Sequence, residues 1–373
     1  MLTRILSLSI LLAGVVFAGA PNEALVQGLY EGTLKDGKLE VRVVGQGDGK
    51  YRVLVRNDVG GGKIEKAELW ALTAGDEVSI SGKSGETEWK AVYADGAFKG
   101  TAGAVAFEIK RVERKSPTMG KAPPEGAIVL LDGKDFKEIV RANGAEWFLG
   151  DMSKHGAPVW EVPLVMIGKD PAEWPSAEKP LPEGWKVGKE RRRADMVIGI
   201  GEDGSIQVPK GGINSAKPIE GSFDYHVEFM NPFQPKEHSQ GRGNSGVYLP
   251  NGQEIQVLDS FGECTYTGGG CGGLYAYQDP LTMDTIESIK PPENKYNLTS
   301  LPPGTWQTYD IQYRVEKKDG KWVGKPKITV FFNGIKIHDN VELKQDAKKG
   351  AFHLQDHGNA VRYRNIWAVP VDK

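Results

Sequence analysis

Short runs in which apolar and polar residues alternate recur along most of this chain, separated by Gly, Asn or Asp residues. Examples are KLEVRVVG at 38–45, KYRVLVR at 50–56 and EIQVLDS at 254–260. A period of two places successive side chains on opposite faces of a β-strand, whereas the helical period of 3.6 is almost absent. The 48 Gly and 22 Pro residues suit frequent turns. The sequence therefore predicts an all-β protein.

Two β regions are expected, joined by a Pro-rich stretch. Residues 21–114 contain several alternating runs and predict a small N-terminal β domain. The segment KSPTMGKAPPE at 115–125 has the composition of an interdomain linker. Residues 126–373 contain many further runs, which predict a sandwich of two packed antiparallel sheets. A curved sandwich of this size has a concave face on which an extended sugar could lie.

The first twenty residues differ from the rest. Arg4 precedes an apolar run at 5–17, and the small residues Ala18, Gly19 and Ala20 follow it. This is the pattern of a cleaved secretory signal peptide at 1–20, and the apolar run is too short to span a bilayer. We expect a periplasmic or extracellular protein that has no membrane span after cleavage.

Export would place the two cysteines in an oxidising compartment. Cys264 and Cys271 bracket the flexible loop TYTGGG, so a disulfide between them is expected. Closing so short a loop would stabilise the fold by about 2.5 kcal/mol in the chain-entropy model. Two cysteines without a nearby pair of histidines make a poor zinc site.

Charge and acidic spacing limit the other partners. The net charge of −2 gives no basic field for nucleic acid. The run KERRR at 189–193 suits a solvated loop, with a basic ligand-binding patch as the alternative. No cofactor is expected. Ca²⁺ bound by loop carboxylates and backbone carbonyls stays open as an alternative, although no spaced acidic loop points to such a site.

Strand alternation selects candidate functional residues. In 254–258, Glu254 and Gln256 share one face of the strand, opposite apolar residues. The same pattern near the C terminus exposes Gln355, Arg362 and Arg364 and places Asp356 and His357 at a strand end. A solvated sheet surface is the plain alternative to a site.

Five motifs follow one another in a specific order. They are GNSGVYLPNGQEIQVLD, GGLYAYQDP, GTWQTYDIQYRV, ITVFFNGIKIHDN and GAFHLQDHGNAVRYRNIW. In this order the chain resembles the 3-keto-disaccharide hydrolase family, formerly domain of unknown function 1080, over roughly residues 126–370. The resemblance implies a concanavalin A-like jelly roll that cleaves 3-keto glycosides. The N-terminal β domain lies outside it.

The implied reaction has definite chemical needs. A carbonyl at C3 acidifies the proton on C2, a base removes that proton, and the glycosidic oxygen at C1 leaves by β-elimination. Water then adds to the enone, and the result is hydrolysis. Such a site needs a base, an acid for the leaving oxygen and donors for the enolate oxygen.

We expect His357 or Glu254 to be the base, and Asp259 or the other of that pair to be the acid. Arg364 would stabilise the enolate oxygen. The expected substrate-binding residues are Asn244, Tyr248, Gln256, Tyr275, Gln355 and Asp356.

Two other functions stay open at this stage. Glu254, Gln256 and Asp259 loosely resemble the carboxylate strand of retaining β-glucan hydrolases, although Gln replaces the middle acid. A sugar-binding jelly roll without catalysis is the second. Cleavage of an unoxidised glycoside would identify a retaining β-glucan hydrolase. Binding of a sugar without turnover would identify a sugar-binding jelly roll.

Overall fold

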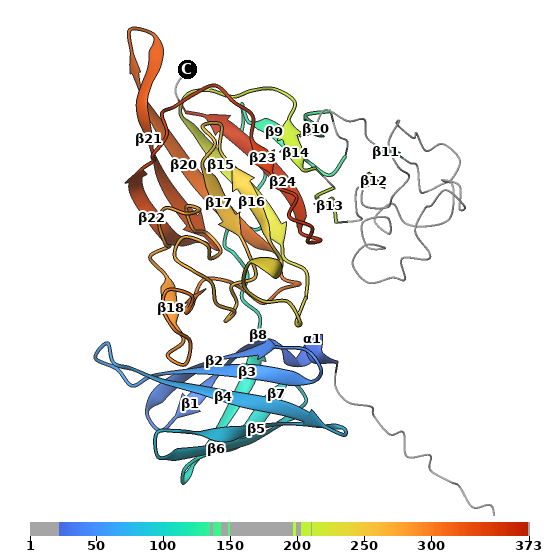
Figure 1. Cartoon of the computed structure of the whole chain (residues 1–373), viewed down its shortest axis with the longest axis vertical. Helices are drawn as coiled ribbons and strands as arrows, with labels where there is room; N and C mark the ends of the chain where they lie inside the picture. Colours follow the sequence, from blue (N-terminus) through green and yellow to red (C-terminus); the bar gives the residue numbers. More distant parts are fainter. Residues whose placement is uncertain are drawn as a thin grey trace, which may run out of the picture.

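The computed structural model describes residues 22–134, 137–142, 148–149, 197–198, 203–209 and 211–371. The predicted signal peptide and the run at 189–193 lie outside the described residues. Within the described part of the chain, no helix is long and apolar enough to cross a membrane. Figure 1 shows a β-barrel below a β-sandwich, so the predicted all-β fold is confirmed.

The N-terminal domain is a closed barrel in which each strand pairs antiparallel with the next and the last returns to the first. After the short helix α1 (Glu23–Val26), its strands are β1 (Gly28–Leu34), β2 (Gly37–Gly45), β3 (Lys50–Asp58), β4 (Ile64–Ala74), β5 (Glu77–Ser84), β6 (Thr87–Ala94), β7 (Ala97–Ala102) and β8 (Val105–Val112). Strand β8 pairs with β1 and so closes the barrel.

The second unit packs two antiparallel sheets face to face. The five-stranded sheet has the order β10 (Ile139–Arg141), β14 (Ile213–Ser215), β23 (His353–Leu354), β16 (Ser245–Tyr248) and β17 (Glu254–Val257). The seven-stranded sheet has the order β13 (Ile206–Gln207), β24 (Arg362–Pro370), β15 (Phe223–Met230), β20 (Gln307–Lys318), β21 (Lys321–Phe332) and β22 (Ile335–Glu342), with β9 (Ile128–Leu131) beside β24.

Three further short elements lie in the described residues of the second unit. They are the parallel pair β11 (Phe148–Leu149) and β12 (Val197–Ile198), the hairpin of β18 (Met283–Thr285) and β19 (Lys295–Asn297), and the 3₁₀ turn η4 (Ser239–Gly241).

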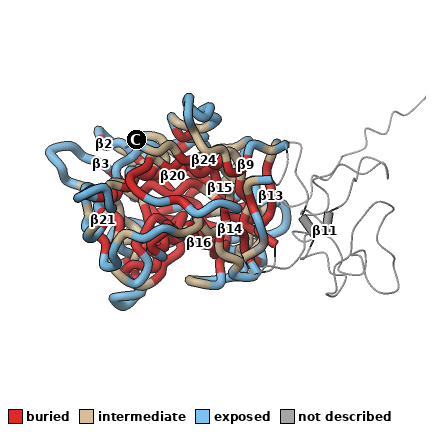
Figure 2. Tube along the Cα trace, turned by 90° about the horizontal axis from the view of Figure 1, so that it is seen from above, coloured by how far each residue is buried: buried red, intermediate tan, exposed pale blue. Residues whose placement is uncertain are grey.

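The apolar residues of each strand meet between the two sheets. Val247 and Ile255 of the five-stranded sheet share a buried cluster with Phe229, Tyr309 and Tyr363 of the seven-stranded sheet. In Figure 2 the buried residues, drawn in red, gather in the middle of this unit. Because side chains alternate along a strand, the polar residues of the two sheets point away from this core in opposite directions.

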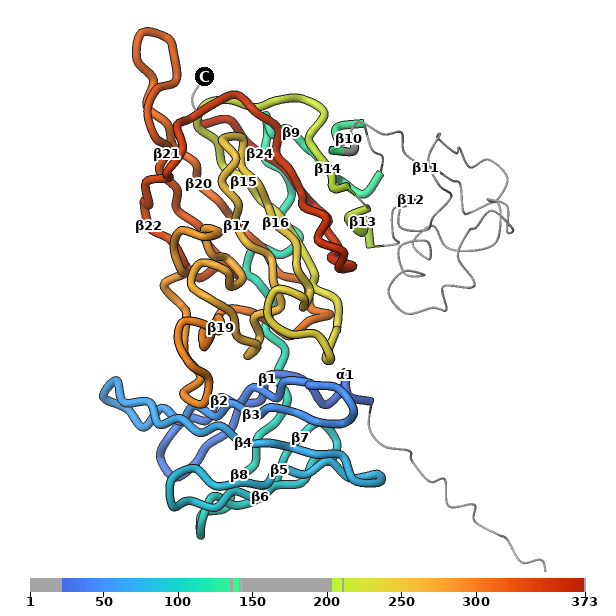
Figure 3. The backbone as a smooth tube through the Cα atoms, viewed as in Figure 1, coloured from blue at the N-terminus to red at the C-terminus, as the bar shows by residue number. Residues whose placement is uncertain are grey.

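The Pro-rich segment after β8 is bound along its length to the seven-stranded sheet. Ser116 Oγ lies 2.6 Å from Thr308 Oγ1, and the amide of Gly120 donates to Glu228 Oε1 at 2.6 Å. The carbonyl of Lys121 accepts from Trp367 Nε1 at 3.2 Å. Figure 3 shows the chain passing from β8 along the sandwich to β9. The segment predicted to be an interdomain linker is therefore held against the sheet by hydrogen bonds.

Two buried arginines join the barrel to the sandwich. Arg42 of β2 is 1% exposed and donates to the carbonyl of Ser300 at 3.0 Å. In the opposite direction, fully buried Arg242 of the sandwich donates to the carbonyl of Gly45 at 2.9 Å. Each unit therefore supplies a cation that satisfies backbone oxygens of the other.

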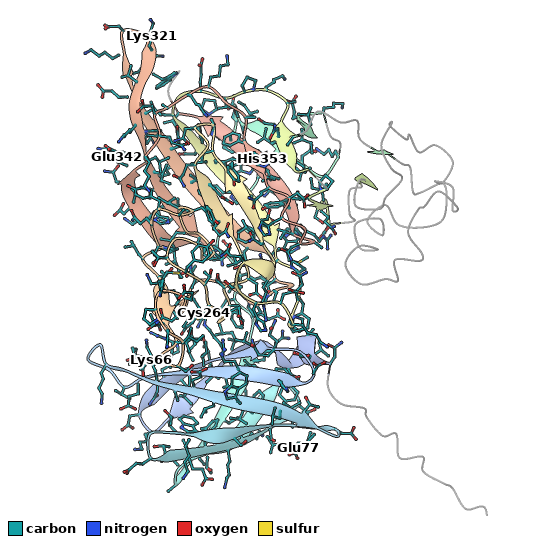
Figure 4. The ribbon with its side chains drawn as sticks, in the orientation of Figure 1. Lys66, Glu77, Cys264, Lys321, Glu342 and His353 are labelled. Carbon is teal, nitrogen blue, oxygen red and sulfur yellow. The ribbon has the colours of Figure 1, made fainter. Side chains whose placement is uncertain are left out.

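The predicted disulfide is wrong. Both cysteines are free and buried. Cys264 packs in a small cluster with Leu54 and Tyr296, close to the barrel (Figure 4). Cys271 lies in the sandwich core, where its Sγ is 3.1 Å from the hydroxyl of Tyr309. The loop between them directs the two thiols into different apolar clusters, and burial raises both of their pKa values.

We expect a reducing agent to leave the melting temperature unchanged, because no cross-link is present to lose. Thiol titration of the protein unfolded without reductant should find both cysteines free. If the melting temperature fell in dithiothreitol and free thiols appeared only after reduction, Cys264 and Cys271 would form a disulfide after all.

Candidate active site

A row of polar side chains crosses the outer face of the five-stranded sheet. The strand register places Glu254 opposite Tyr248, Tyr248 opposite His353, and His353 opposite Asn214. Residues directly opposite each other on neighbouring strands point to the same face, so these four side chains are neighbours. Figure 4 labels His353 on this sheet.

Hydrogen bonds hold the row together. The Tyr248 hydroxyl donates to Glu254 Oε2 at 2.7 Å, and Gln355 Nε2 donates to the same hydroxyl at 3.1 Å. His353 Nδ1 lies 2.8 Å from Asn214 Oδ1. Gly246 makes room for the carboxylate, because a Cβ there would lie 2.1 Å from Glu254 Oε1.

Glu254 is a carboxyl group in an unusual environment. Although it belongs to the outer face, the residue is only 5% exposed. Burial disfavours the charged form and raises the pKa of Glu254 from 4.5 to about 7, while the hydrogen bond from Tyr248 acts in the opposite direction. A group with this pKa exchanges protons readily near neutral pH, which suits a general acid or base.

Amide side chains form the next layer beside the carboxylate. The amides of Gln256 and Gln240 lie 2.9 Å apart, and Asn244 Nδ2 donates to the carbonyl of Gln240 at 2.7 Å. If the Gln256 amide is rotated by 180°, its nitrogen donates to Glu254 Oε1 at 3.3 Å. These groups have the hydrogen-bonding capacity that sugar hydroxyls require.

Two tyrosines stand at the edge of the row. The hydroxyls of Tyr266 and Tyr275 are 2.8 Å apart, and the backbone amide of Tyr275 donates to the carbonyl of Glu254 at 3.1 Å. Tyr275 is 38% exposed. An exposed aromatic ring beside buried polar groups is a suitable surface for the apolar face of a sugar.

Of the predicted site residues, the structure therefore brings together Glu254, Tyr248, Gln256, Asn244, Gln355 and Tyr275. It adds His353, Asn214, Gln240 and Tyr266, which were not selected from the sequence. Alternation along the strand places His353 on the same face as Gln355, so the sequence did carry a signal for His353. Burial lowers the pKa of His353, which favours its neutral form.

Asp259 lies apart from this row. Its carboxylate accepts from Arg242 Nε at 2.7 Å, and both side chains are almost fully buried. A buried carboxylate committed to an arginine holds the junction with the barrel together. Its predicted role as the acid has no support from this position.

Arg364 lies on the opposite outer face of the sandwich. Its Nε donates to Glu228 Oε2 at 2.7 Å, and its guanidinium stacks on Trp306 at 4.1 Å. The sandwich core separates β24 from the face of Glu254, so the two residues are not in one site. The predicted grouping of Arg364 with Glu254 is therefore not what the structure shows.

His357 and Asp356 lie in the turn after β23. Asp356 accepts from the amides of Gly358 and Gly211, both at 2.9 Å, and so fixes the turn. His357 is exposed. Its role as a base remains a prediction.

Among the described residues, no group of three or more His, Cys, Asp or Glu side chains could hold a metal ion. The polar row offers a carboxyl group for proton transfer and amides and hydroxyls for hydrogen bonding.

Comparison with known proteins gives one family. The sequence profile of the 3-keto-alpha-glucoside-1,2-lyase-like domain matches residues 167–369, more than half of the chain, and confirms the resemblance drawn from the motifs. No curated protein matches the sequence. One similar solved structure is that of a "putative glycosyl hydrolase" from Parabacteroides distasonis ATCC 8503, with 25% identity, coverage of 66% of this chain and 85% of that chain, and a TM-score of 0.42.

Proposed function

The chain belongs to the 3-keto-alpha-glucoside-1,2-lyase-like family, and from this premise we propose that it cleaves 3-keto glycosides with Glu254 as the proton-transfer group. The observation that carries the proposal is a buried carboxyl group with a pKa near 7 in a row of polar side chains.

In the proposed reaction, ionised Glu254 takes the proton from C2 of the 3-keto sugar. The electron pair of the C2–H bond moves toward C3, and an enolate forms. The enolate then re-forms the carbonyl, the C1–O bond breaks, and the leaving oxygen takes its electron pair and the proton that Glu254 received from C2. Addition of water to the enone, with hydroxide at C1 and a proton at C2, completes hydrolysis.

The residues around Glu254 have matching tasks. Tyr248, 2.7 Å from Glu254 Oε2, orients the carboxylate. Gln256, Gln355 and Asn244 would bind the sugar hydroxyls, and Tyr275 would pack against the ring.

A retaining glucanase mechanism lacks the second carboxylate that the sequence suggested for it. That mechanism needs two carboxyl groups about 5–5.5 Å apart across the glycosidic bond. Asp259, the partner expected from the sequence, is paired with Arg242 in the buried junction. Sugar binding without catalysis is left as an outcome of the assay.

The deciding experiment compares an aryl glucoside with its 3-keto derivative on the purified protein. We expect release of the aryl alcohol from the 3-keto substrate alone, and a slower release when C2 carries deuterium. Release from the plain glucoside would identify a conventional hydrolase. Binding of both compounds without release would identify a sugar-binding module.

Tyr248→Phe should move the acidic limb of the pH profile of kcat/KM to higher pH. The lost hydrogen bond favours the ionised carboxylate, so its removal raises the pKa of Glu254 further. A base is active only when ionised, so more alkaline solution is then needed. Tyr275→Phe is the matched control, because that hydroxyl bonds to Tyr266. If the acidic limb of the Tyr248→Phe profile stayed in place, the limb would not report the ionisation of Glu254.

We also propose that residues 1–20 direct export to the periplasm or beyond. Mass spectrometry of protein from a periplasmic fraction should find a mature N terminus close to residue 19 or 21. A cytoplasmic protein that keeps Met1 would contradict export.

A further inference from the structure

The N-terminal barrel has no part in the proposed reaction and lies outside the residues that match the family. It is an up-and-down closed barrel of β1 to β8. Barrels of this size either fill their interior with side chains or hold one small ligand. The side chains at each end of the barrel decide between the two.

One end of the barrel is filled with aromatic rings. Tyr30, Tyr51, Tyr93 and Phe98 all lie near the strand ends that meet at the turns 45–50, 74–77 and 94–97. The ring of Phe98 lies 5.2 Å from that of Tyr30 and 5.1 Å from that of Tyr93. This end is closed.

The other end is open. Small residues line its turns, among them Ser84, Ala102, Gly103 and Ala104. They leave a cavity of about 660 Å³, which Trp89 also lines. Trp89 packs on Phe107 at 5.4 Å, so aromatic rings close the barrel below the cavity. The barrel therefore has the form of a cup that is open at one end. The β3–β4 loop lies at this end, and Figure 1 shows where that loop is.

The lining of the cup is predominantly polar and has no net formal charge. Its ionisable residues are Lys35, Asp36, Glu65 and Lys66. Two positive and two negative groups do not favour a strongly charged ligand. The polar lining equally does not favour a fatty acid chain.

Asn57 gives the cup an unused acceptor. It lines the cavity, is 5% exposed, and its Oδ1 has no hydrogen-bond partner in the described part of the chain. A buried polar atom without a partner costs about 1–3 kcal/mol. A ligand hydroxyl could donate to this oxygen once the amide turns toward the cavity.

We propose that the barrel cup binds a neutral mono- or disaccharide, at a site separate from Glu254. The edge of the Trp89 indole, which is 6% exposed, gives the cup a small apolar contact for a sugar ring. Around it, an amide, two carboxylates and the hydroxyls of Ser84 and Thr87 offer partners for sugar hydroxyls. The barrel would hold a carbohydrate next to the domain that cleaves one.

Calorimetric titration of the full chain with glucose, maltose and cellobiose tests the proposal, in a Glu254→Gln background to prevent turnover. Ala104 is exposed in a turn at the open end, so Ala104→Trp should block the cup without disturbing the core. Ala74, exposed at the closed end, gives the matched control Ala74→Trp. We expect Ala104→Trp to remove one saccharide site per chain and Ala74→Trp to remove none.

Three results would overturn the proposal: equal numbers of saccharide sites in both variants, no saccharide binding by the parent, or binding of palmitate in place of sugars. Ala104→Trp in the otherwise native chain should keep the full rate on a small 3-keto glucoside. The result of the saccharide titration does not depend on whether the proposed reaction is correct. The titration counts binding sites in the barrel, whereas the assay of the reaction depends on Glu254.

Discussion

Glu254→Gln should lower kcat/KM on a 3-keto glycoside by roughly 100- to 10,000-fold, the usual contribution of a positioned general acid or base. Glutamine keeps the shape of the side chain and can still bond to Tyr248, but it cannot accept the C2 proton. Steady-state kinetics would measure the loss. Glu220→Gln, at an exposed residue, is the matched control and should keep the full rate.

The same substitution should make the protein more stable at pH 8. The folded chain holds the Glu254 proton up to about pH 7, whereas the unfolded chain releases it near 4.5, so folding loses stability as pH rises through this range. Above pH 7 the accumulated cost is about 3 kcal/mol, which glutamine avoids. At pH 4 the two proteins should be alike.

This pH dependence distinguishes lost chemistry from lost structure. A damaged fold would make Glu254→Gln less stable than the native protein at both pH values. If Glu254→Gln kept nearly native turnover, Glu254 would not be the base. His357 would then be the remaining candidate from the sequence.

Asp259→Ala should lower the free energy of unfolding by about 3–5 kcal/mol, because it leaves a buried arginine without its counter-ion. Arg242 and Asp259 are both nearly fully buried, so neither can turn to water. Urea denaturation followed by circular dichroism would measure the change. Asp339→Ala breaks the exposed pair with Lys336 and should cost about 0–1 kcal/mol.

The double variant Arg242→Met with Asp259→Leu should recover much of the loss, since it removes both buried charges. If Asp259→Ala instead kept its stability and lost its turnover, Asp259 would be the acid predicted from the sequence.

Alternation along single strands was enough to find Glu254, and its neighbours on β16 and β17 followed from the same rule. Alternation could not show that Glu254 is buried. Residues from distant parts of the sequence lie beside it: the amide of Tyr275 donates to its carbonyl, and Gln240 contacts Gln256 on the same strand. The raised pKa depends on this burial and is invisible in the sequence.

Arg364 shows a second limit of the same rule. It shares the polar pattern of Glu254, yet its strand belongs to the other sheet and its side chain points away on the far side of the core. A period of two gives the face of a strand but not the sheet that contains it. The predicted disulfide was wrong for a related reason. The conformation of the loop decides where each thiol points, and the sequence does not show that conformation.

The exchanged arginines at the junction also bear on how such a protein can be rearranged. A chain cut after the barrel would leave Arg42 without the carbonyl of Ser300 and the sandwich without the carbonyl of Gly45 for Arg242. A module that replaced the barrel would therefore have to offer Arg242 a new acceptor, and the sandwich would lose the guanidinium that binds its Ser300 carbonyl.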